Sequence, residues 1–220
     1  MQYRIALILC LLCLSNTLHA EREAFTLPNG DRYEGDFVDG VLSGSGVYEW
    51  ADGDRYEGQF SNDLPSGTGT YFWADGRRYD GEFVAGKRQG YGSLTWVNGD
   101  RYEGAFLANQ MHGEGTFLWG NGDRYEGDFI ANQRYGAGSM LWRGGQRYEG
   151  DFADDTMHGQ GIYRWPDGRL FKGSFIGGRR TGVGIFAATD GTLFRGFFAD
   201  DQRHGLVVKQ LSNGERFFEL

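Results

Sequence analysis

Three histidines are the residues of this chain whose type and spacing first suggest a chemical role. His112, His158 and His204 follow one another at equal intervals, and each one precedes a glycine. Imidazole nitrogen is a common zinc ligand, and a shared zinc site would bring the three rings within about 2 Å of one ion. Whether they can meet depends on the elements that carry them.

Other arrangements that support catalysis are missing or stand in the wrong context. The acid pairs Asp154-Asp155 and Asp200-Asp201 carry nothing that marks a matched general acid and base. No Gly-x-Ser-x-Gly nucleophile elbow is present. Several Gly-x-Gly pairs occur, but each opens a strand pattern and not a helix, so a phosphate-binding loop is not indicated. We therefore predict that this chain is not an enzyme and uses no cofactor.

A strict repeat organises the chain. An aromatic residue recurs every 23 residues without insertion or deletion, at Tyr33, Tyr56, Tyr79, Tyr102, Tyr125, Tyr148, Phe171, Phe194 and Phe217. Thirty-two of the 38 glycines fall at four positions of this repeat, and all six tryptophans share another. Such a period is typical of a repeat architecture, and it shows that the glycine content is structural and not low-complexity.

The repeat resembles the MORN repeat (membrane occupation and recognition nexus). The resemblance rests on Tyr125-Glu126-Gly127-Asp128-Phe129 followed by Gly136-Ala137-Gly138, and it extends over about Ala24 to Leu220. It implies a single long twisted sheet of β-hairpins, with a groove that can hold a helix or a peptide. It also implies a second option, association with membrane lipid. MORN arrays often accompany a catalytic domain, but we expect none in these 220 residues, because the repeats occupy nearly all of them.

The residue pattern itself predicts an all-β fold with two strands in each repeat. Arg-Tyr-Glu-Gly-x-Phe and Gly-x-aromatic-x-Trp both alternate with period two, and Asp-Gly or Asn-Gly turn signals such as Asn121-Gly122 separate them. We expect a signal peptide over residues 1–20 and an array over 21–220. The array would comprise a half repeat at 24–32, eight repeats that begin at 33, 56, 79, 102, 125, 148, 171 and 194, and a partial repeat at 217–220.

This architecture separates the histidines. They lie two repeats apart, which is four strands, or roughly 19 Å at about 4.8 Å per strand. We place them in loops and predict no metal site. Cys10 and Cys13 would leave with the signal peptide, so the mature chain would contain no cysteine and no thiolate metal site.

The register of the two strands decides which side chains share a face. We predict that large residues face small ones, with Phe106 opposite Gly115 and Gly104 opposite Phe117. This register also sets Tyr102 opposite Trp119, and it requires a longer or bulged turn at Asn121-Gly122. One face then becomes an aromatic strip, and the other carries Arg and Glu or Asp as solvated salt bridges worth about 0–1 kcal/mol each.

Two surfaces are candidates for binding. The centre of the aromatic strip comprises Tyr79, Phe83, Trp96, Tyr102, Phe106, Trp119, Tyr125, Phe129 and Trp142. The alternative role of this strip is packing within the sheet. A basic segment near the C-terminus contributes Arg169, Lys172, Arg179, Arg180 and Arg195. These could meet an anionic partner, or they could simply keep the end of the array soluble.

The leading functional hypothesis is an exported, non-catalytic scaffold that binds a protein or peptide along the strip. Membrane lipid is the second candidate partner, and carbohydrate is the third because aromatic platforms beside acids suit sugar rings. Nucleic acid is excluded as the main partner by the net charge, which is −8 for the whole chain and −9 without Arg4.

The first 20 residues have the composition of a secretory signal. Arg4 precedes an apolar run from Ile5 to Leu14, and Ala20 offers a small residue for cleavage. The apolar run is shorter than the about 20 residues of a spanning helix. We expect a periplasmic or extracellular protein; the alternative is anchoring to a membrane by the uncleaved segment.

Export predicts a defined start for the mature protein. N-terminal sequencing of the purified protein should begin near Glu21, because cleavage is expected after Ala20. A full-length protein recovered from the cytoplasm with Met1 intact would contradict export.

Overall fold

The computed structural model describes residues 21–220, and the predicted signal peptide lies outside them. The described residues form eighteen β-strands and no helix. The described residues divide into two compact units between Gln89 and Gly90, and each unit is described by itself. The all-β fold of repeated antiparallel hairpins that the sequence predicts is confirmed.

In the first unit the strands form one antiparallel sheet in chain order. They are β1 (Glu21–Thr26), β2 (Arg32–Val38), β3 (Val41–Glu49), β4 (Arg55–Ser61), β5 (Leu64–Phe72) and β6 (Arg78–Val84). β1 overlaps the start of the half repeat predicted at 24–32 and pairs with β2.

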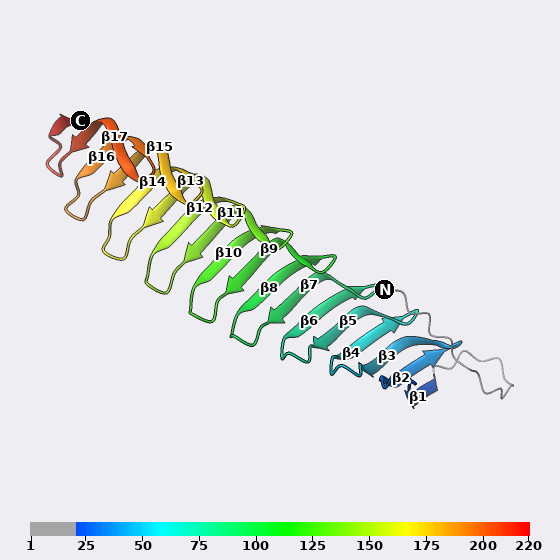
Figure 1. Ribbon diagram of the computed structural model, residues 1–220. Coiled ribbons are helices and arrows are strands. Elements are labelled where there is room, and N and C mark those ends of the chain that lie inside the picture. The colour runs from blue at the N-terminus through cyan, green and yellow to red at the C-terminus, as the bar shows by residue number, and fades with distance from the viewer. Residues whose placement is uncertain (1–20) are drawn as a thin grey trace. The chain divides into compact units, whose positions relative to one another are not determined.

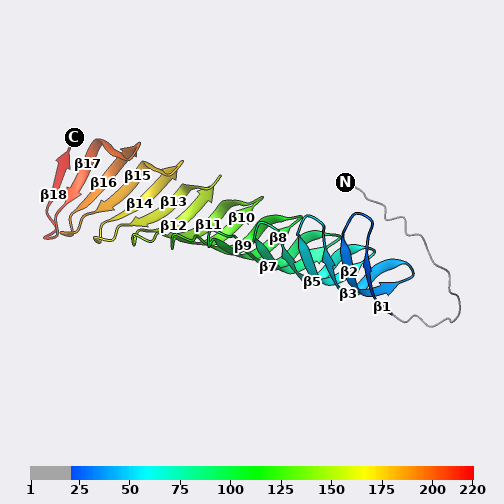
Figure 2. The same ribbon diagram turned by 60° about the horizontal axis from the view of Figure 1, so that its bottom comes forward.

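The second unit repeats the same meander (Figure 1). Its strands are β7 (Lys87–Thr95, which begins just before the division), β8 (Arg101–Leu107), β9 (Gln110–Leu118), β10 (Arg124–Ile130), β11 (Gln133–Leu141), β12 (Arg147–Ala153), β13 (Thr156–Arg164), β14 (Leu170–Ile176), β15 (Arg179–Ala187), β16 (Leu193–Ala199), β17 (Gln202–Gln210) and β18 (Arg216–Glu219). Figure 2 shows a single layer of strands in each unit.

Two kinds of turn alternate along each sheet, and the sequence analysis identified only one of them. The turn within a repeat has two residues, such as Ala131 and Asn132 between β10 and β11. Their φ angles are 51° and 71°. Positive φ at both positions is the type I′ geometry, whose twist matches that of the flanking strands. The Asn132 side chain also accepts a hydrogen bond from Met111 N at 2.9 Å, so the turn ties its repeat to the preceding one.

The turn between repeats is longer, as predicted. Trp119 N donates to Asp123 O at 3.0 Å, and Gly122 N donates to Trp119 O at 2.9 Å, which closes a five-residue loop. Asp123 Oδ1 accepts a hydrogen bond from Arg143 N of the next loop at 2.8 Å. The same side-chain link recurs between other repeats, so neighbouring loops are joined on this edge as well.

The predicted register is wrong by two residues. In β8 and β9 the opposed pairs are Tyr102 with Phe117 and Gly104 with Gly115, and a β-bulge then sets Phe106 opposite Met111. The Tyr102 ring does not stay above its own cross-strand neighbour. It extends along β8 over the two glycines, where a Cβ on either one would lie 2.5–2.6 Å from the tyrosine hydroxyl. Glycine is therefore paired with glycine because both make room for one ring.

Each tyrosine is locked by two phenylalanines and by the bulge. The Tyr125 ring meets Phe129 at 5.2 Å and Phe152 of the next repeat at 5.0 Å, both edge to face. Its hydroxyl donates to Asp128 O at 3.1 Å, at the bulge. Tyrosine and phenylalanine thus alternate across repeats in a buried row, which we call the aromatic spine. This row is the core of a single-layer sheet.

Alkaline pH should unfold the array through the spine. Burial raises the pKa of Tyr33, Tyr56 and Tyr79 from 10 to about 12. The neutral hydroxyl is therefore favoured by the folded state, and this stability is complete below pH 10 and is lost as the pH rises from 10 toward 12. Thermal denaturation across this range should show a falling Tm for the wild type. Replacing the three by Phe, which the chain itself has at Phe171, should flatten the fall, and an unchanged slope would contradict the mechanism.

Candidate functional site

The two faces of the sheet differ in chemistry because side chains alternate along each strand. On β8 and β9, the side chains of Tyr102, Phe117 and Trp119 share one side. We call it the aromatic face. Arg101 and Glu103 lie on the other side, which we call the charged face. In the described residues no helix and no second sheet covers either face.

The structure separates the nine residues predicted as the centre of the strip into two groups. Six belong to the aromatic spine and are at most 4% exposed; they are Tyr79, Phe83, Tyr102, Phe106, Tyr125 and Phe129. Trp96, Trp119 and Trp142 are only partly buried. The spine residues offer almost no surface to a partner, whereas the tryptophans do. Tyr79 and Phe83 lie in the first unit, and the other seven lie in the second.

The tryptophans form their own row beside the spine, close to the five-residue loops. In the second unit, Phe117 stacks between Trp96 and Trp119, with ring centroids 5.4 and 4.5 Å apart. Tyr163 lies in the same way between Trp142 and Trp165, at 5.6 and 4.6 Å. We call Trp96, Trp119, Trp142 and Trp165 the tryptophan row. Neighbouring rings hold each indole in place without covering it.

Arginines also line the aromatic face, and the sequence analysis missed one of the best placed. The Arg134 guanidinium lies 5.5–5.6 Å from the ring centres of Trp119, Tyr125 and Phe152. Its Nε donates to Asp155 Oδ1 at 3.1 Å, and its side chain is 20% exposed. A signal was available, because the tenth position of the repeat alternates between arginine and methionine, at Arg88, Met111, Arg134, Met157 and Arg180. An arginine at this position places its guanidinium cation over the rings of the aromatic face.

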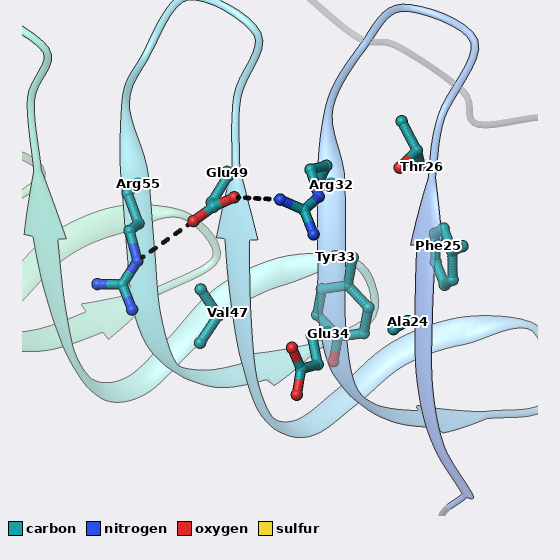
Figure 3. Close-up of a pocket in the computed structure, with 9 residues that line it drawn as sticks. All are labelled: Ala24, Phe25, Thr26, Arg32, Tyr33, Glu34, Val47, Glu49 and Arg55. Atoms are coloured by element: carbon teal, nitrogen blue, oxygen red, sulfur yellow. Dashed lines mark ion pairs between the residues drawn. The ribbon is translucent and has the colours of Figure 1, made fainter.

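The charged face carries the salt-bridge ladder that the sequence predicts. Arg124 pairs with Glu126 at 2.8 Å, and Arg147 pairs with Glu149 at 2.9 Å. The ladder varies near β1, where Glu49 lies between Arg32 and Arg55, 3.6 and 3.7 Å from them (Figure 3). These side chains are well exposed, so each pair contributes at most about 1 kcal/mol.

The five basic residues predicted as one anionic-partner patch do not lie together. Lys172 and Arg195 flank Ile185 on the charged face. Arg179 pairs with Asp200 at 3.2 Å beside a two-residue turn. Arg169 and Arg180 line a cavity of about 430 Å³ on the aromatic face. The period-two alternation of the strands explains this division, since neighbours in sequence point to opposite sides.

The histidines lie in strands, and their predicted placement in loops is wrong. His112 belongs to β9, His158 to β13 and His204 to β17. They follow the two-residue turns, and the sequence analysis had not found these turns. Residues 21–220 contain no group of three or more His, Cys, Asp or Glu side chains arranged to hold a metal ion. The same residues include no helix long and apolar enough to cross a membrane.

Comparison with protein-family models gives one family for the whole array. The model described as MORN repeat matches eight times, at residues 33–55, 56–77, 79–101, 102–124, 125–147, 148–168, 171–193 and 194–216. The number and phase of the repeats are those predicted from the sequence. No curated protein matches this chain.

Several solved structures show similarity over most of the chain. The Drosophila melanogaster SAS-4 (dCPAP) TCP domain in complex with a proline-rich motif of Ana2 is 11% identical, with 97% of this chain and 98% of that chain covered and a TM-score of 0.43. The Danio rerio CPAP TCP10 domain in complex with a STIL peptide is 13% identical, with 84% and 96% covered and a TM-score of 0.29. At TM-scores below 0.5, neither similarity decides a property of this chain.

Arg134 should contribute little to the free energy of unfolding, because it lies at the surface of the aromatic face. We expect Arg134→Met to lower the free energy of unfolding by about 1 kcal/mol, because Met111 and Met157 occupy the same position in neighbouring repeats and the lost pair is modest. Phe129→Ala should cost about 3–5 kcal/mol, since Phe129 belongs to the spine. Urea denaturation of both variants measures these changes in the free energy of unfolding. Equal losses in the two variants would assign Arg134 to the core.

Proposed function

Since the chain belongs to the MORN repeat family, we propose that it is a non-catalytic scaffold that binds a protein segment along the tryptophan row of its aromatic face. The observation that carries the proposal is a row of partly exposed indoles on a face that no other described element covers. Partly exposed aromatic side chains gathered on one face often mark a site for a partner.

The spine and the tryptophan row have different parts in this proposal. The spine rings are held by edge-to-face contacts and by glycine pairs beneath them, so they set the shape of the face. The tryptophans keep ring surface open, and Trp119 is flanked by the Arg134 guanidinium. Tryptophan and arginine are the residues most enriched in binding hot spots, which supports this part of the face as the binding surface.

The spacing of the row indicates what kind of segment fits. Successive tryptophans each follow every second strand, so they are roughly 10 Å apart at about 4.8 Å per strand. Seven residues of an α-helix rise about 10.5 Å. A helix that crosses the strands could therefore place one apolar side chain against each tryptophan at heptad spacing. Peptide-binding proteins commonly use such an apolar helix face in a groove.

The proposed place of action is outside the cytoplasm. It rests on the composition of residues 1–20, which lie outside the described part of the structure. Acidic net charge speaks against broad attraction to anionic lipid, so a protein partner in the periplasm or outside the cell is favoured over a membrane surface.

Site-specific photo-crosslinking tests which face binds. A photoreactive phenylalanine analogue at Trp119 should capture a partner from the envelope fraction, whereas the same analogue at Leu118 should not. Leu118 is the matched control, since it is the adjacent residue, is 42% exposed and faces the opposite side. With the analogue placed at Trp142 instead, Trp96→Ala and Trp119→Ala should reduce capture more than they reduce stability, and Phe106→Ala should do the reverse.

Two outcomes would contradict the proposal. Equal crosslinking from Leu118 would move binding to the charged face or to both faces. Trp variants that unfold the protein as strongly as Phe106→Ala would assign the row to the core. Flotation with anionic liposomes serves as the parallel assay, and binding there that persists in the Trp variants would favour lipid at another surface.

A further inference from the structure

A cavity of about 430 Å³ opens on the aromatic face between β13 and β17. Its walls include Trp165, Phe186 and Phe194. Trp165 and Phe186 have ring centroids 5.8 Å apart, and Phe186 and Phe194 are 6.2 Å apart. The cavity belongs entirely to the second unit, and it lies beyond the tryptophans predicted as the centre of the strip. Its flat apolar walls resemble those elsewhere on this face, and three arginines line it.

Three guanidinium groups surround this cavity. Arg169 and Arg180 lie 5.3 and 5.6 Å from the Trp165 ring, and Arg203 lies 4.4 Å from the Phe194 ring. Asp201 is the one acid among the lining residues. Stacking on the rings fixes the plane of each guanidinium and leaves its edge free to donate hydrogen bonds.

The hydrogen bonds inside the protein do not use all of these donors. Arg180 donates to Asp201 through Nε at 2.9 Å and through Nη2 to the backbone oxygen at 2.6 Å. Arg169 donates through Nε to Asp167 at 2.7 Å. Arg203 approaches Glu219 at 3.6 Å, too far for a hydrogen bond. Within residues 21–220, Nη1 of Arg180 and both terminal nitrogens of Arg169 have no hydrogen-bond partner.

This cluster departs from the other repeats of the second unit. Arginine and methionine alternate at the tenth position from Arg88 to Arg180, but Arg203 follows where the alternation predicts methionine. Arg169 stands where Asp100 and Asp123 accept hydrogen bonds from the next loop. Both departures add positive charge around the same cavity. The first unit has a partial counterpart, in which Arg77 and Arg88 lie 4.9 and 5.5 Å from the Trp73 ring. The additional guanidinium of Arg203, over the Phe194 ring, distinguishes this cavity.

We propose that this cavity is an oxyanion subsite that binds a carboxylate or phosphate group attached to a flat apolar group. The guanidinium forks match the paired oxygens of either anion, and the ring walls match the apolar part. The proposal deepens the proposed function, on which it rests for its biological partner, by assigning an anionic group to the end of the bound segment near β14 to β17.

Small probes test the subsite without any protein partner. Benzoate, phenyl phosphate and the neutral benzamide would be titrated into ¹⁵N-labelled protein, and the Nε–H signals of Arg169, Arg180 and Arg203 would be followed by NMR. We expect saturable shifts with both anions and none with benzamide. The tighter of the two anions identifies the source as a carboxylate or a phosphate. Because no partner is needed, failure here does not refute binding along the tryptophan row, and failure of that binding does not refute the subsite.

Substitutions taken from the repeat itself provide the variants. Arg203→Met and Arg169→Asp install the residues that other repeats have at these positions, so the fold should tolerate them. Each should weaken anion binding by about tenfold, because each removes a charge-assisted hydrogen-bond donor. Lys172→Glu with Arg195→Glu is the control on the charged face, and it should change affinity less than twofold.

Three results would contradict the proposed oxyanion subsite. Benzamide binding as tightly as benzoate would show an apolar groove without anion selectivity. An equal loss in the Lys172→Glu/Arg195→Glu control would show general electrostatic attraction. Absence of saturation with either anion in the wild-type protein, with its Tm unchanged by the additions, would show that the cavity holds no anion.

Discussion

The structure of each unit depends on the packing of one tyrosine ring over a pair of facing glycines. A single-layer sheet has no second layer against which to bury apolar surface, so it must make a core from its own side chains. Gly104 and Gly115 have no side chain, and the Tyr102 ring fills the space above both. Any side chain at either glycine would collide with this ring or with the opposite backbone. The repeat therefore needs glycine at both positions on steric grounds.

The β-bulge follows from the same packing. The Tyr102 hydroxyl reaches the carbonyl oxygen of Ala105 at 2.9 Å, where the strand has left its regular pairing. The bulge also turns Phe106 toward Tyr102, with centroids 5.2 Å apart. Phe129 of the next repeat closes the other side of the ring. Each repeat is thus completed by its neighbour, which is the nearest-neighbour coupling typical of repeat proteins.

The proposed function rests on the side chains that this packing leaves accessible. The rings of tyrosine and phenylalanine are almost completely buried in the spine. The ladder of ion pairs covers the charged face with solvated side chains. The tryptophan row and the stacked arginines remain accessible on the aromatic face. Such an arrangement allows binding residues to change from repeat to repeat without disturbing the core. Arg203 and Arg169 are such changes, because neither replaces a residue of the spine.

The sequence by itself determined the fold class, the number and phase of the repeats and the alternation of two chemically different faces. These properties depend on the period of 23 and on the period of two within a strand, and both are visible in one dimension. The tertiary structure alone decided the register, because Tyr102 covers a glycine pair further along its strand and not the residue directly opposite. It also decided that Lys172 and Arg180 lie on opposite faces, and that Arg203 joins Arg169 and Arg180 around one cavity. Such groupings arise from bulges and ring stacking across strands, which sequence spacing does not express.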